Sequence, residues 1–402
     1  MPQYLRAFLF DSTQTPAEQL IENVFSTWSN RQAVSIIPAT YPKLQIDTSI
    51  IRCDPSEVID LADGSTHKRN LAIVDTPDLA AVVLTSGTTG DPLPVELGFE
   101  SMKSSVNSLY RKCNLRSTDT WLCCVPVHYI AGLAILARCY ISKSKLIFHP
   151  TFDTKAIQKS IEHNSVTSIS LVATQLRRLL NDNVDLSSLK TILVGGGKFD
   201  DELKTRCKEL NLNVFSSYGM TETWGGICID GEFLDNTQGR VVNDQLELTS
   251  GSLMLGYRHN YPATIARLTP DHWFKTKDRA EIIDGILKIY GRMDDLIISG
   301  GIKIDPLPLE ETIKALFPGH ELHVIATDHD SFGQSSTVCF LNSDSTIPQI
   351  DEIRIALTEH LPSTHMPLRT ATIESFPKTE SGKIQRNEIS KNCKIIDEHL
   401  VG

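Results

Sequence analysis

A run of hydroxyl and glycine residues could hold a phosphate group. It follows the apolar run Ala80–Leu84, which is bounded by turn residues and predicts a buried strand. Its glycines allow a close approach to a bulky anion, and its hydroxyls and backbone N–H groups can donate hydrogen bonds to phosphate oxygens. A plain surface turn has the same composition, and no Gly-Lys-Ser/Thr follows to make a Walker A site. The run consists of Thr85, Ser86, Gly87, Thr88, Thr89 and Gly90.

A second stretch combines an aromatic ring, a hydroxyl and a carboxylate. In residues 214–222 a predicted strand ends at Tyr218 and Gly219, and Thr221 and Glu222 follow. Taken alone, the stretch is typical of an ordinary strand-to-helix turn.

Charged side chains at three later positions suit the same chemistry. Asp278 ends the run Phe274–Asp278, and Arg292 carries a fork-shaped cation suited to ribose and phosphate oxygens. Lys383 follows Ser-Gly in a lysine-rich segment and carries a point charge on a flexible stem. Taken alone, Asp278 would be typical of a surface loop, the Arg292 stretch of a charged hairpin that joins two sheets, and the lysine-rich segment of a solvated face.

The ordered set of stretches resembles the motifs of the adenylate-forming superfamily, which contains acyl-CoA ligases, peptide-synthetase adenylation domains and luciferases. The resemblance runs from residue 84 to residue 386. The first loop resembles T-S-G-T-T-G-x-P-K, but Leu93 stands where that pattern has lysine. The later stretches resemble Y-G-M-T-E, T-G-D with Lys277 in place of the glycine, G-R-x-D-D-x-I-K-x-x-G-x-x-I, and P-K-T-x-S-G-K-I-x-R.

The resemblance implies that ATP and magnesium bind to the first part of this set. The loop of residues 85–90 would bind phosphates, Thr221 would contact the α-phosphate and Glu222 would hold magnesium. Asp278 would grip the ribose hydroxyls, and Arg292 would contact ribose and phosphate oxygens. The residues implied to lie around the adenine are Gly195, Gly196, Gly197, Tyr218 and Gly219.

The resemblance further implies a reaction in two steps, with a domain movement between them. Lys383 would bridge the attacking carboxylate and the α-phosphate in the first step. Asp294 would be the hinge, where a small change of backbone dihedrals swings the C-terminal domain. Coenzyme A would be the acceptor in the second step, and the residues implied to face it are Gly300, Gly301 and Lys303.

The segment Pro126–Arg138 bears on the choice of acid. This segment and the short region before the phosphate loop most resemble the superfamily members that ligate 2-succinylbenzoate to coenzyme A in menaquinone synthesis. His128 and Tyr129 are the candidate substrate residues, with a packed turn as the alternative for His128. A ligase for another aromatic or fatty acid remains possible, as does a non-catalytic nucleotide-binding relative, which Leu93 suggests.

The pattern of predicted elements indicates an α/β protein of two domains. Strands and helices alternate up to about residue 200, which predicts mainly parallel sheets covered by helices, with ligands at the carboxyl ends of the strands. Short alternating strands from about residue 239, among them Leu253–Leu255, predict a small β layer. We expect an ATP- and acid-binding domain over residues 1–293 and a mobile α+β domain over residues 294–402.

Composition and charge exclude several other classes of protein. The net charge of −10 over 402 residues argues against a protein that coats nucleic acid. The nine cysteines lack metal-ligand spacing and indicate reduced thiols of a cytoplasmic protein. No targeting leader is recognised, and charged residues interrupt the most apolar region, Ile130–Phe148, so no membrane span is expected. The sequence leaves the oligomeric state open.

Overall fold

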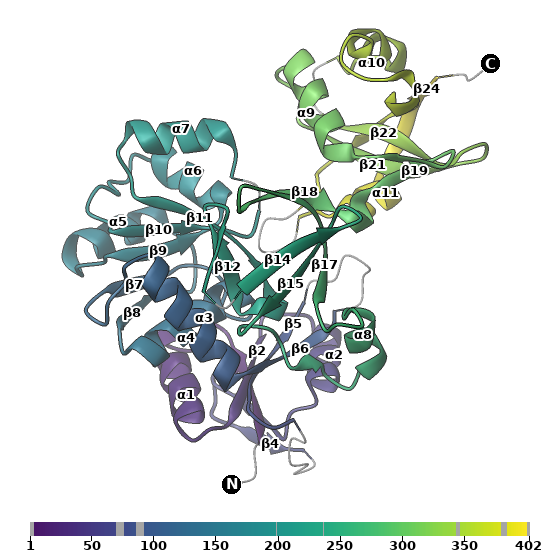
Figure 1. Cartoon of the computed structure of the whole chain (residues 1–402). Helices are drawn as coiled ribbons and strands as arrows, with labels where there is room; N and C mark the ends of the chain where they lie inside the picture. The colour runs from purple at the N-terminus through teal and green to yellow at the C-terminus, as the bar shows by residue number, and fades with distance from the viewer. Residues whose placement is uncertain are drawn as a thin grey trace. The chain divides into compact units, whose positions relative to one another are not determined.

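The chain divides into two compact units in a computed structural model that describes residues 4–69, 76–85, 92–197, 199–235, 237–342, 346–378 and 384–399. The N-terminal unit comprises residues 1–240, 247–276 and 282–287, and the C-terminal unit comprises residues 241–246, 277–281 and 288–402. Figure 1 follows the chain through both units and labels many of their helices and strands. The hinge expected at Asp294 stays a prediction.

The first sheet of the N-terminal unit has a parallel centre. Its strands are β1 (Leu5–Phe10), β2 (Ala33–Pro38), β3 (Glu57–Asp60), β4 (Thr66–Lys68), β5 (Leu79–Leu84), β6 (Pro94–Gly98) and β16 (Gly256–Tyr257). Four of them run parallel in the order β5-β2-β1-β3, and the other three extend the sheet in antiparallel fashion. Helices α1 (Ala17–Ser29) and α2 (Lys43–Cys53) pack on this sheet. Buried Trp28 on α1 ties helix to sheet, because its Nε1 donates a hydrogen bond to the carbonyl of Ala80 at 2.9 Å.

The second sheet of the N-terminal unit has five adjacent parallel strands. Its strands are β7 (Thr120–Cys123), β8 (Lys145–Phe148), β9 (Ser168–Leu171), β10 (Thr191–Val194), β11 (Val214–Met220), β12 (Gly225–Ile229) and β13 (Glu232–Phe233). The order β8-β7-β9-β10-β11 is parallel, and β12 and β13 add an antiparallel edge. The helices are α3 (Phe99–Lys112), α4 (Ile130–Ser142), α5 (Thr154–His163), α6 (Ala173–Asn181) and α7 (Asp201–Glu209).

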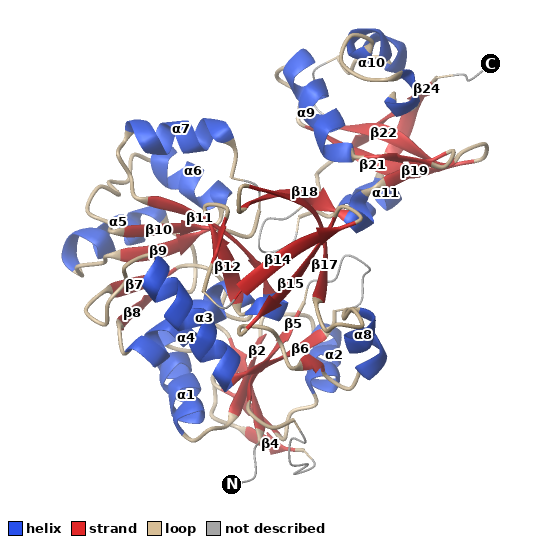
Figure 2. Cartoon of the chain, viewed as in Figure 1, coloured by secondary structure: helices blue, strands red, loops and turns tan. Residues whose placement is uncertain are grey.

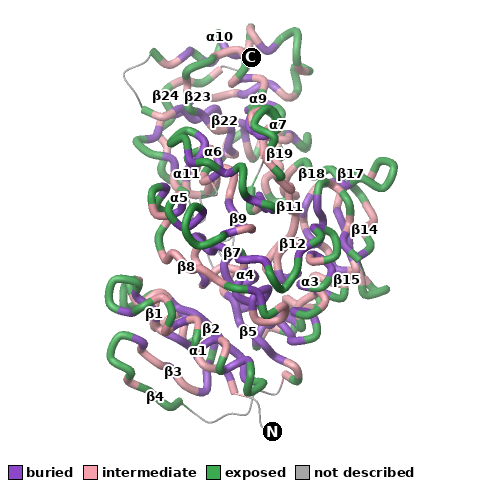
Figure 3. Tube along the Cα trace, turned by 90° about the vertical axis from the view of Figure 1, so that its left-hand side faces the viewer, coloured by how far each residue is buried: buried purple, intermediate pink, exposed green. Residues whose placement is uncertain are grey.

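Alternate residues of the second sheet enter two different cores. Trp121 and Cys123 of β7 pack with α3 and α4 and with the first sheet, whereas Leu122 between them packs with α5, α6 and α7. This is the period of two that a strand with helices on both faces requires. Figure 2 shows the helices on either side of the sheet, and Figure 3 shows buried chain along its strands.

The rest of the chain forms a four-stranded sheet and the bulk of the C-terminal unit. The four-stranded sheet has the order β14 (Thr237–Val242), β15 (Gln245–Ser250), β17 (Phe274–Ile283) and β18 (Ile286–Arg292), and α8 (Tyr261–Ala266) precedes β17. The C-terminal unit contains β19 (Ile297–Ser299), β20 (Ile302–Ile304), β21 (Leu322–His329), β22 (Gly333–Leu341), β23 (Arg369–Ile373), β24 (Lys394–Glu398), α9 (Pro306–Leu316), α10 (Ile350–Leu357) and α11 (Arg386–Asn392). Apolar side chains of α9 and α10 pack against β21 and β22 to form its core.

The fold class predicted from the sequence is confirmed, including the small β layer and the α+β unit that follows it. One predicted strand is wrong: Leu253–Leu255 is not a strand, and the short β16 follows it instead. There the backbone N–H of Met254 donates to the backbone carbonyl of Glu222, and that of Leu255 donates to the backbone carbonyl of Glu96. These two hydrogen bonds hold the segment, although it does not form a strand. Within the described part of the chain, no helix is both long and apolar enough to span a membrane.

Candidate functional site

The predicted phosphate loop lies between two strands that pair with each other. Strands β5 and β6 pair in antiparallel fashion up to Leu84 and Pro94. Beyond that pair, the N–H of Thr85 donates to the carbonyl of Leu93 at 3.0 Å, and the N–H of Leu93 donates to Thr85 Oγ1 at 3.2 Å. The side chain of Leu93 packs against the core between the two sheets, so an apolar residue suits this position. The remaining predicted loop residues lie outside the described residues: Ser86, Gly87, Thr88, Thr89 and Gly90.

The glycine triplet follows the carboxyl end of β10, as predicted. The N–H of Gly195 donates to the carbonyl of Leu171 at 3.1 Å, and a Cβ on Gly195 would lie 3.2 Å from the carbonyl oxygen of Ser217. Gly196 has a φ of +79°, a conformation that favours glycine. Gly195, Gly196 and Gly197 therefore lie beside β11, the strand that carries the predicted adenine-flanking residues.

The predicted adenine-flanking pair sits at an irregularity of β11. The register with β12 shifts between Tyr218 and Gly219, as in a β-bulge. A Cβ at Gly219 would lie 1.8 Å from the carbonyl oxygen of Gly225, so the two strands can approach this closely only with glycine there. The chain then enters a 3-10 turn, Thr221–Thr223, whose last hydroxyl donates to the Gly225 carbonyl at 2.7 Å. These contacts fix the turn that carries Glu222.

The carboxylate of Glu222 is buried, with 7% of the residue exposed, and two side chains hold it. The Tyr257 hydroxyl donates to Oε1 at 2.7 Å, and Arg267 donates from Nε to the Tyr257 oxygen at 3.2 Å. Arg267 Nη2 also lies 3.7 Å from Oε1. Burial, followed by the nearby carboxylate, raises the pKa of Tyr257, so its hydroxyl stays protonated and remains a donor. Sequence reasoning missed Tyr257 and Arg267, because neither lies in a stretch that matched the superfamily pattern.

This arrangement fits a magnesium ligand. The contacts of the Glu222 carboxylate with the described residues fall on Oε1, so Oε2 accepts no hydrogen bond from any of those residues. A hard divalent cation that keeps several waters needs one or two such oxygens and no cage of protein ligands. Among the residues that the structure describes, no cluster of three or more His, Cys, Asp or Glu side chains could hold a metal ion.

The candidate acid-binding residues lie between β7 and α4. A Cβ on Gly132 would lie 2.5 Å from the carbonyl oxygen of Pro126, so glycine lets the first turn of α4 pack against this connection. His128 is half-buried between two aromatic rings: its centroid is 4.2 Å from that of Tyr129 and 5.9 Å from that of Tyr41. Tyr41 belongs to a region for which the sequence suggested no chemistry.

The C-terminal unit contains the predicted ribose residue and the predicted hinge. Arg292 donates from Nη1 to Asp278 Oδ1 at 3.1 Å, and its Nη2 lies 3.7 Å from Asp294. Lys277 lies 3.2 Å from Asp294 and has a φ of +65°, a strained value at the position where the superfamily pattern has glycine. Burial lowers the pKa of Arg292, but the carboxylates of Asp278 and Asp294 outweigh burial and the net shift is upward. These four residues therefore form one charged network.

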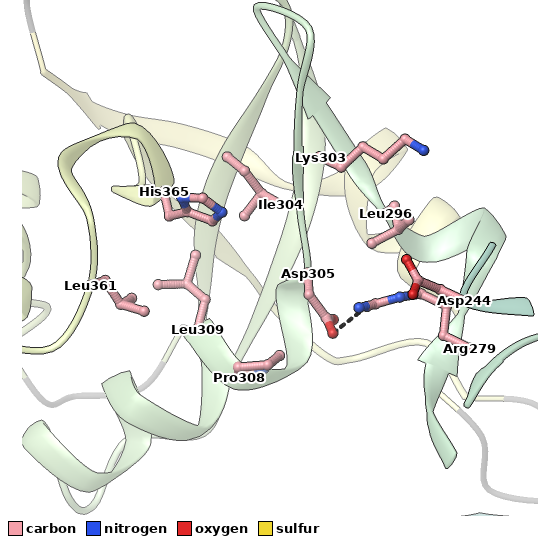
Figure 4. A pocket seen from close by; sticks show the side chains of 10 residues that line it. All are labelled: Asp244, Arg279, Leu296, Lys303, Ile304, Asp305, Pro308, Leu309, Leu361 and His365. Atoms are coloured by element: carbon pink, nitrogen blue, oxygen red, sulfur yellow. Dashed lines mark hydrogen bonds and ion pairs between the residues drawn. The ribbon is translucent and has the colours of Figure 1, made fainter. Parts of the chain in front are cut away.

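Three residues predicted to face coenzyme A lie on the β19–β20 hairpin. Gly300 and Gly301 form its turn with φ of +56° and +83°, and Lys303 follows on β20. Lys303 lines a cavity of about 320 Å³, and Figure 4 shows its ammonium group pointing away from His365 on the opposite wall. An ion pair between Arg279 and Asp305 closes one side of the cavity. The other lining residues are Asp244, Leu296, Ile304, Pro308, Leu309 and Leu361.

Lys383 lies outside the described residues, but the chain is firmly held just after it. Arg386 donates from Nη2 to the buried carboxylate of Glu310 at 2.7 Å, and His323 lies 2.9 Å from the same carboxylate. Burial opposes ionisation of Glu310, but these partners and Lys314 hold its pKa well below the usual value. The end of the predicted lysine loop is therefore anchored to α9.

The structure thus collects the predicted residues into one set for each unit. The N-terminal set comprises Thr85, His128, Tyr129, Gly195, Gly196, Gly197, Tyr218, Gly219, Thr221 and Glu222. All of these lie at or just after the carboxyl ends of β5, β7, β10 and β11, the edge where ligands of parallel sheets bind. The C-terminal set comprises Asp278, Arg292, Asp294, Gly300, Gly301 and Lys303.

Comparisons with known proteins show which family and fold this chain shares. The family described as AMP-binding enzyme matches residues 7–249. The 2-succinylbenzoate–CoA ligase of Listeria monocytogenes serovar 1/2a is 33% identical over 347 residues, 82% of this chain and 74% of that protein. The o-succinylbenzoate CoA synthetase (MenE) of Bacillus subtilis in complex with the acyl-adenylate intermediate OSB-AMP has a similar fold, with a TM-score of 0.83 and 22% identity over 99% of this chain and 89% of that one. The structure of the same enzyme in complex with ATP and magnesium ion has a TM-score of 0.82 and 22% identity, and the match covers 97% of this chain and 89% of that one.

Proposed function

The chain belongs to the AMP-binding enzyme family, and on that basis we propose that it is an AMP-forming ligase that joins 2-succinylbenzoate to coenzyme A. The observation that carries this proposal is the 33% identity with the Listeria 2-succinylbenzoate–CoA ligase along most of both chains. The reaction has two steps. The acid carboxylate attacks the α-phosphate of ATP and releases pyrophosphate, and the thiol of coenzyme A then attacks the acyl carbon and releases AMP.

In the first step the N-terminal set binds the nucleotide. The hairpin turn between β5 and β6 holds the phosphates, Tyr218 covers the adenine, and Thr221 contacts the α-phosphate. Glu222 offers Oε2 to magnesium, which when bound screens the charge of the phosphates. Because no side chain forms a covalent bond to the substrate, the protein acts by placing the carboxylate in line and by stabilising developing charge.

The C-terminal set completes the nucleotide site and serves the second step. Asp278 accepts hydrogen bonds from the ribose hydroxyls, and Arg292 orients Asp278 and donates to neighbouring oxygens. Lys383 stabilises charge on the α-phosphate during adenylation. A change of backbone dihedrals at Asp294 then exchanges Lys383 for the hairpin of Gly300, Gly301 and Lys303, which faces coenzyme A.

The candidate acid-binding residues His128 and Tyr129 suit an aromatic acid with two carboxylates. His128 and Tyr129 offer an imidazole and an aromatic wall beside the apolar start of α4. A ring substrate needs such a wall, and a second carboxylate needs a polar group at its far end. A site built to hydrogen-bond a polar group discriminates strongly against analogues that lack it, because its partners are then left unpaired.

The test is an acid panel with purified protein, ATP, Mg²⁺ and coenzyme A. Pyrophosphate release and thioester formation are measured with 2-succinylbenzoate, benzoate and a long-chain fatty acid. We expect both products with 2-succinylbenzoate and far less with the other acids. Preference for a fatty acid or a simple benzoate would refute the choice of acid, and no pyrophosphate release with any acid would support a non-catalytic nucleotide-binding protein.

A further inference from the structure

An aromatic residue from the first sheet contacts the candidate acid-binding histidine of the second. Tyr41 lies in the connection between β2 and α2. Its hydroxyl oxygen is 3.3 Å from Nε2 of His128, and the two rings meet edge to face, with an angle of 79° between their planes. The residues are 87 positions apart in the sequence, so the fold and not the local chain brings them together.

The position of Tyr41 in the sheet explains this contact. Tyr41 follows the carboxyl end of β2, which runs parallel to β5, the strand that leads into the phosphate-loop hairpin. The α2 helix that follows Tyr41 also touches this hairpin, because Arg52 donates from Nη1 to the carbonyl of Pro92 at 2.8 Å. The segment of residues 39–53 therefore contacts both His128 and the end of the phosphate loop.

The surroundings of this contact suit a ligand site better than a structural clamp. Tyr41, His128 and Tyr129 are all half-buried, so part of each ring stays accessible to a ligand. A distance of 3.3 Å is also longer than the usual separation of a hydroxyl and its partner. The Tyr41 hydroxyl therefore contributes to the orientation of the imidazole, and part of the imidazole surface stays accessible.

A hydroxyl at Nε2 also decides what the imidazole can offer. The partner of one ring nitrogen fixes the orientation of the ring and determines which nitrogen carries the proton. Without the Tyr41 hydroxyl, the His128 ring could still stack on Tyr129, but it would lose one of the contacts that orient it and favour one tautomer. A polar group of the substrate would then meet a mixture of donors and acceptors.

We propose that Tyr41 is a specificity-determining residue of the acid site, which positions His128 to bind the second carboxylate of an aromatic dicarboxylic acid. Tyr41 acts through His128, so it is a positioning residue. This inference rests on the proposed function, because it takes 2-succinylbenzoate as the substrate. It extends the acid site to the first sheet, into a part of the sequence without any recognisable functional pattern.

The variant Tyr41→Phe keeps the ring and removes the hydroxyl. We expect it to raise the KM for 2-succinylbenzoate about three- to tenfold, the scale of one neutral hydrogen bond, while the KM for ATP and the melting temperature stay unchanged. The KM for benzoate, which lacks the second carboxylate, should rise by a smaller factor than the KM for 2-succinylbenzoate. Tyr261→Phe is the matched control, because Tyr261 is 73% exposed on α8 and its hydroxyl has no part in either site.

A double mutant separates action through His128 from independent action. In the background of His128→Ala, removal of the Tyr41 hydroxyl should add less than about a twofold effect, since coupled residues are not additive. Equal losses for 2-succinylbenzoate, benzoate and ATP would show a structural role and overturn the inference. An unchanged KM for 2-succinylbenzoate in Tyr41→Phe would overturn it as well. Failure of the wild type to turn over 2-succinylbenzoate would instead refute the proposed function, and the assignment of Tyr41 to that acid with it.

Discussion

The two units hold their key carboxylates in different ways. Glu222, in the N-terminal unit, accepts its short hydrogen bond from the neutral Tyr257 hydroxyl, and Arg267 stands 3.7 Å away. Asp278, in the C-terminal unit, accepts directly from the Arg292 guanidinium, which is shared with Asp294. The first arrangement orients a carboxylate while leaving one oxygen for a cation, whereas the second spreads charge over a network whose pairs can exchange. We infer that the N-terminal unit supplies preset groups and the C-terminal unit supplies exchangeable ones.

The largest effect should come from the lysine of the C-terminal unit. Lys383→Ala should slow adenylate formation by about 10²- to 10³-fold, the scale of losing one electrostatic stabiliser of the transition state. Thioester formation from pre-made acyl-adenylate should survive, because the lysine serves only the first step. Pyrophosphate release and single-turnover thioester formation measure the two steps, with Lys378→Ala as the control from the same segment. Equal loss in both steps would refute the role.

The next effect should come from the predicted hinge. Asp294→Pro fixes φ near −65° and removes the exchange partner of Lys277 and Arg292. One half-reaction should then fall at least about tenfold further than the other, a difference of ~1.4 kcal/mol in barrier. The same two assays and a thermal melt measure this. If both steps fall together with the melting temperature, Asp294 is structural and the hinge lies elsewhere.

A smaller effect should come from the Glu222 partner. Tyr257→Phe removes the hydrogen bond to Oε1, so the Mg²⁺ concentration for half-maximal adenylation should rise about three- to tenfold. Binding of Mn²⁺ in the presence of ATP, followed by magnetic resonance, gives a readout that does not depend on turnover. Tyr290→Phe is the matched control, because Tyr290 makes the same kind of bond to Glu281, at 2.6 Å on an exposed strand. Equal responses of the two variants would remove the distinction between the units.

The smallest effect is expected at Leu93. Leu93→Lys restores the lysine of the superfamily pattern, and a lysine stem can lie along the core while its ammonium group reaches water. ATP affinity should stay within about threefold of wild type or tighten, because one added exposed charge contributes little. ATP titration by calorimetry measures this. A large loss of ATP binding would mean that the hairpin turn follows a different path from that of the superfamily.

The sequence predicted those parts of the site that lie in continuous stretches of chain. Tyr218, Glu222 and the glycine triplet could be placed because each follows an apolar run that predicts a strand, and the carboxyl ends of parallel strands meet at one edge. Tyr257 could not be predicted, since it reaches Glu222 only after β16 pairs with β6. A contact between distant segments leaves no local pattern in the sequence from which it could be predicted.

Tyr41 and Leu93 also depend on contacts that the sequence alone does not predict. Tyr41 lies in an ordinary turn, and its contact with His128 depends on how two separate sheets pack around α3 and α4. Leu93 departs from a pattern in which lysine was expected, and only the packing of its side chain against the core gives that departure a physical reason. A sequence pattern therefore reports a missing charge without reporting what has replaced it.

The most direct test is the acid-dependent exchange of pyrophosphate into ATP, followed by thioester formation on addition of coenzyme A. With wild-type protein, Mg²⁺ and 2-succinylbenzoate, we expect exchange that requires both the acid and the metal, and release of AMP together with the thioester when coenzyme A is added. Exchange that does not depend on any carboxylic acid, or thioester formation accompanied by ADP and phosphate in place of AMP and pyrophosphate, would contradict a two-step, AMP-forming acid activation.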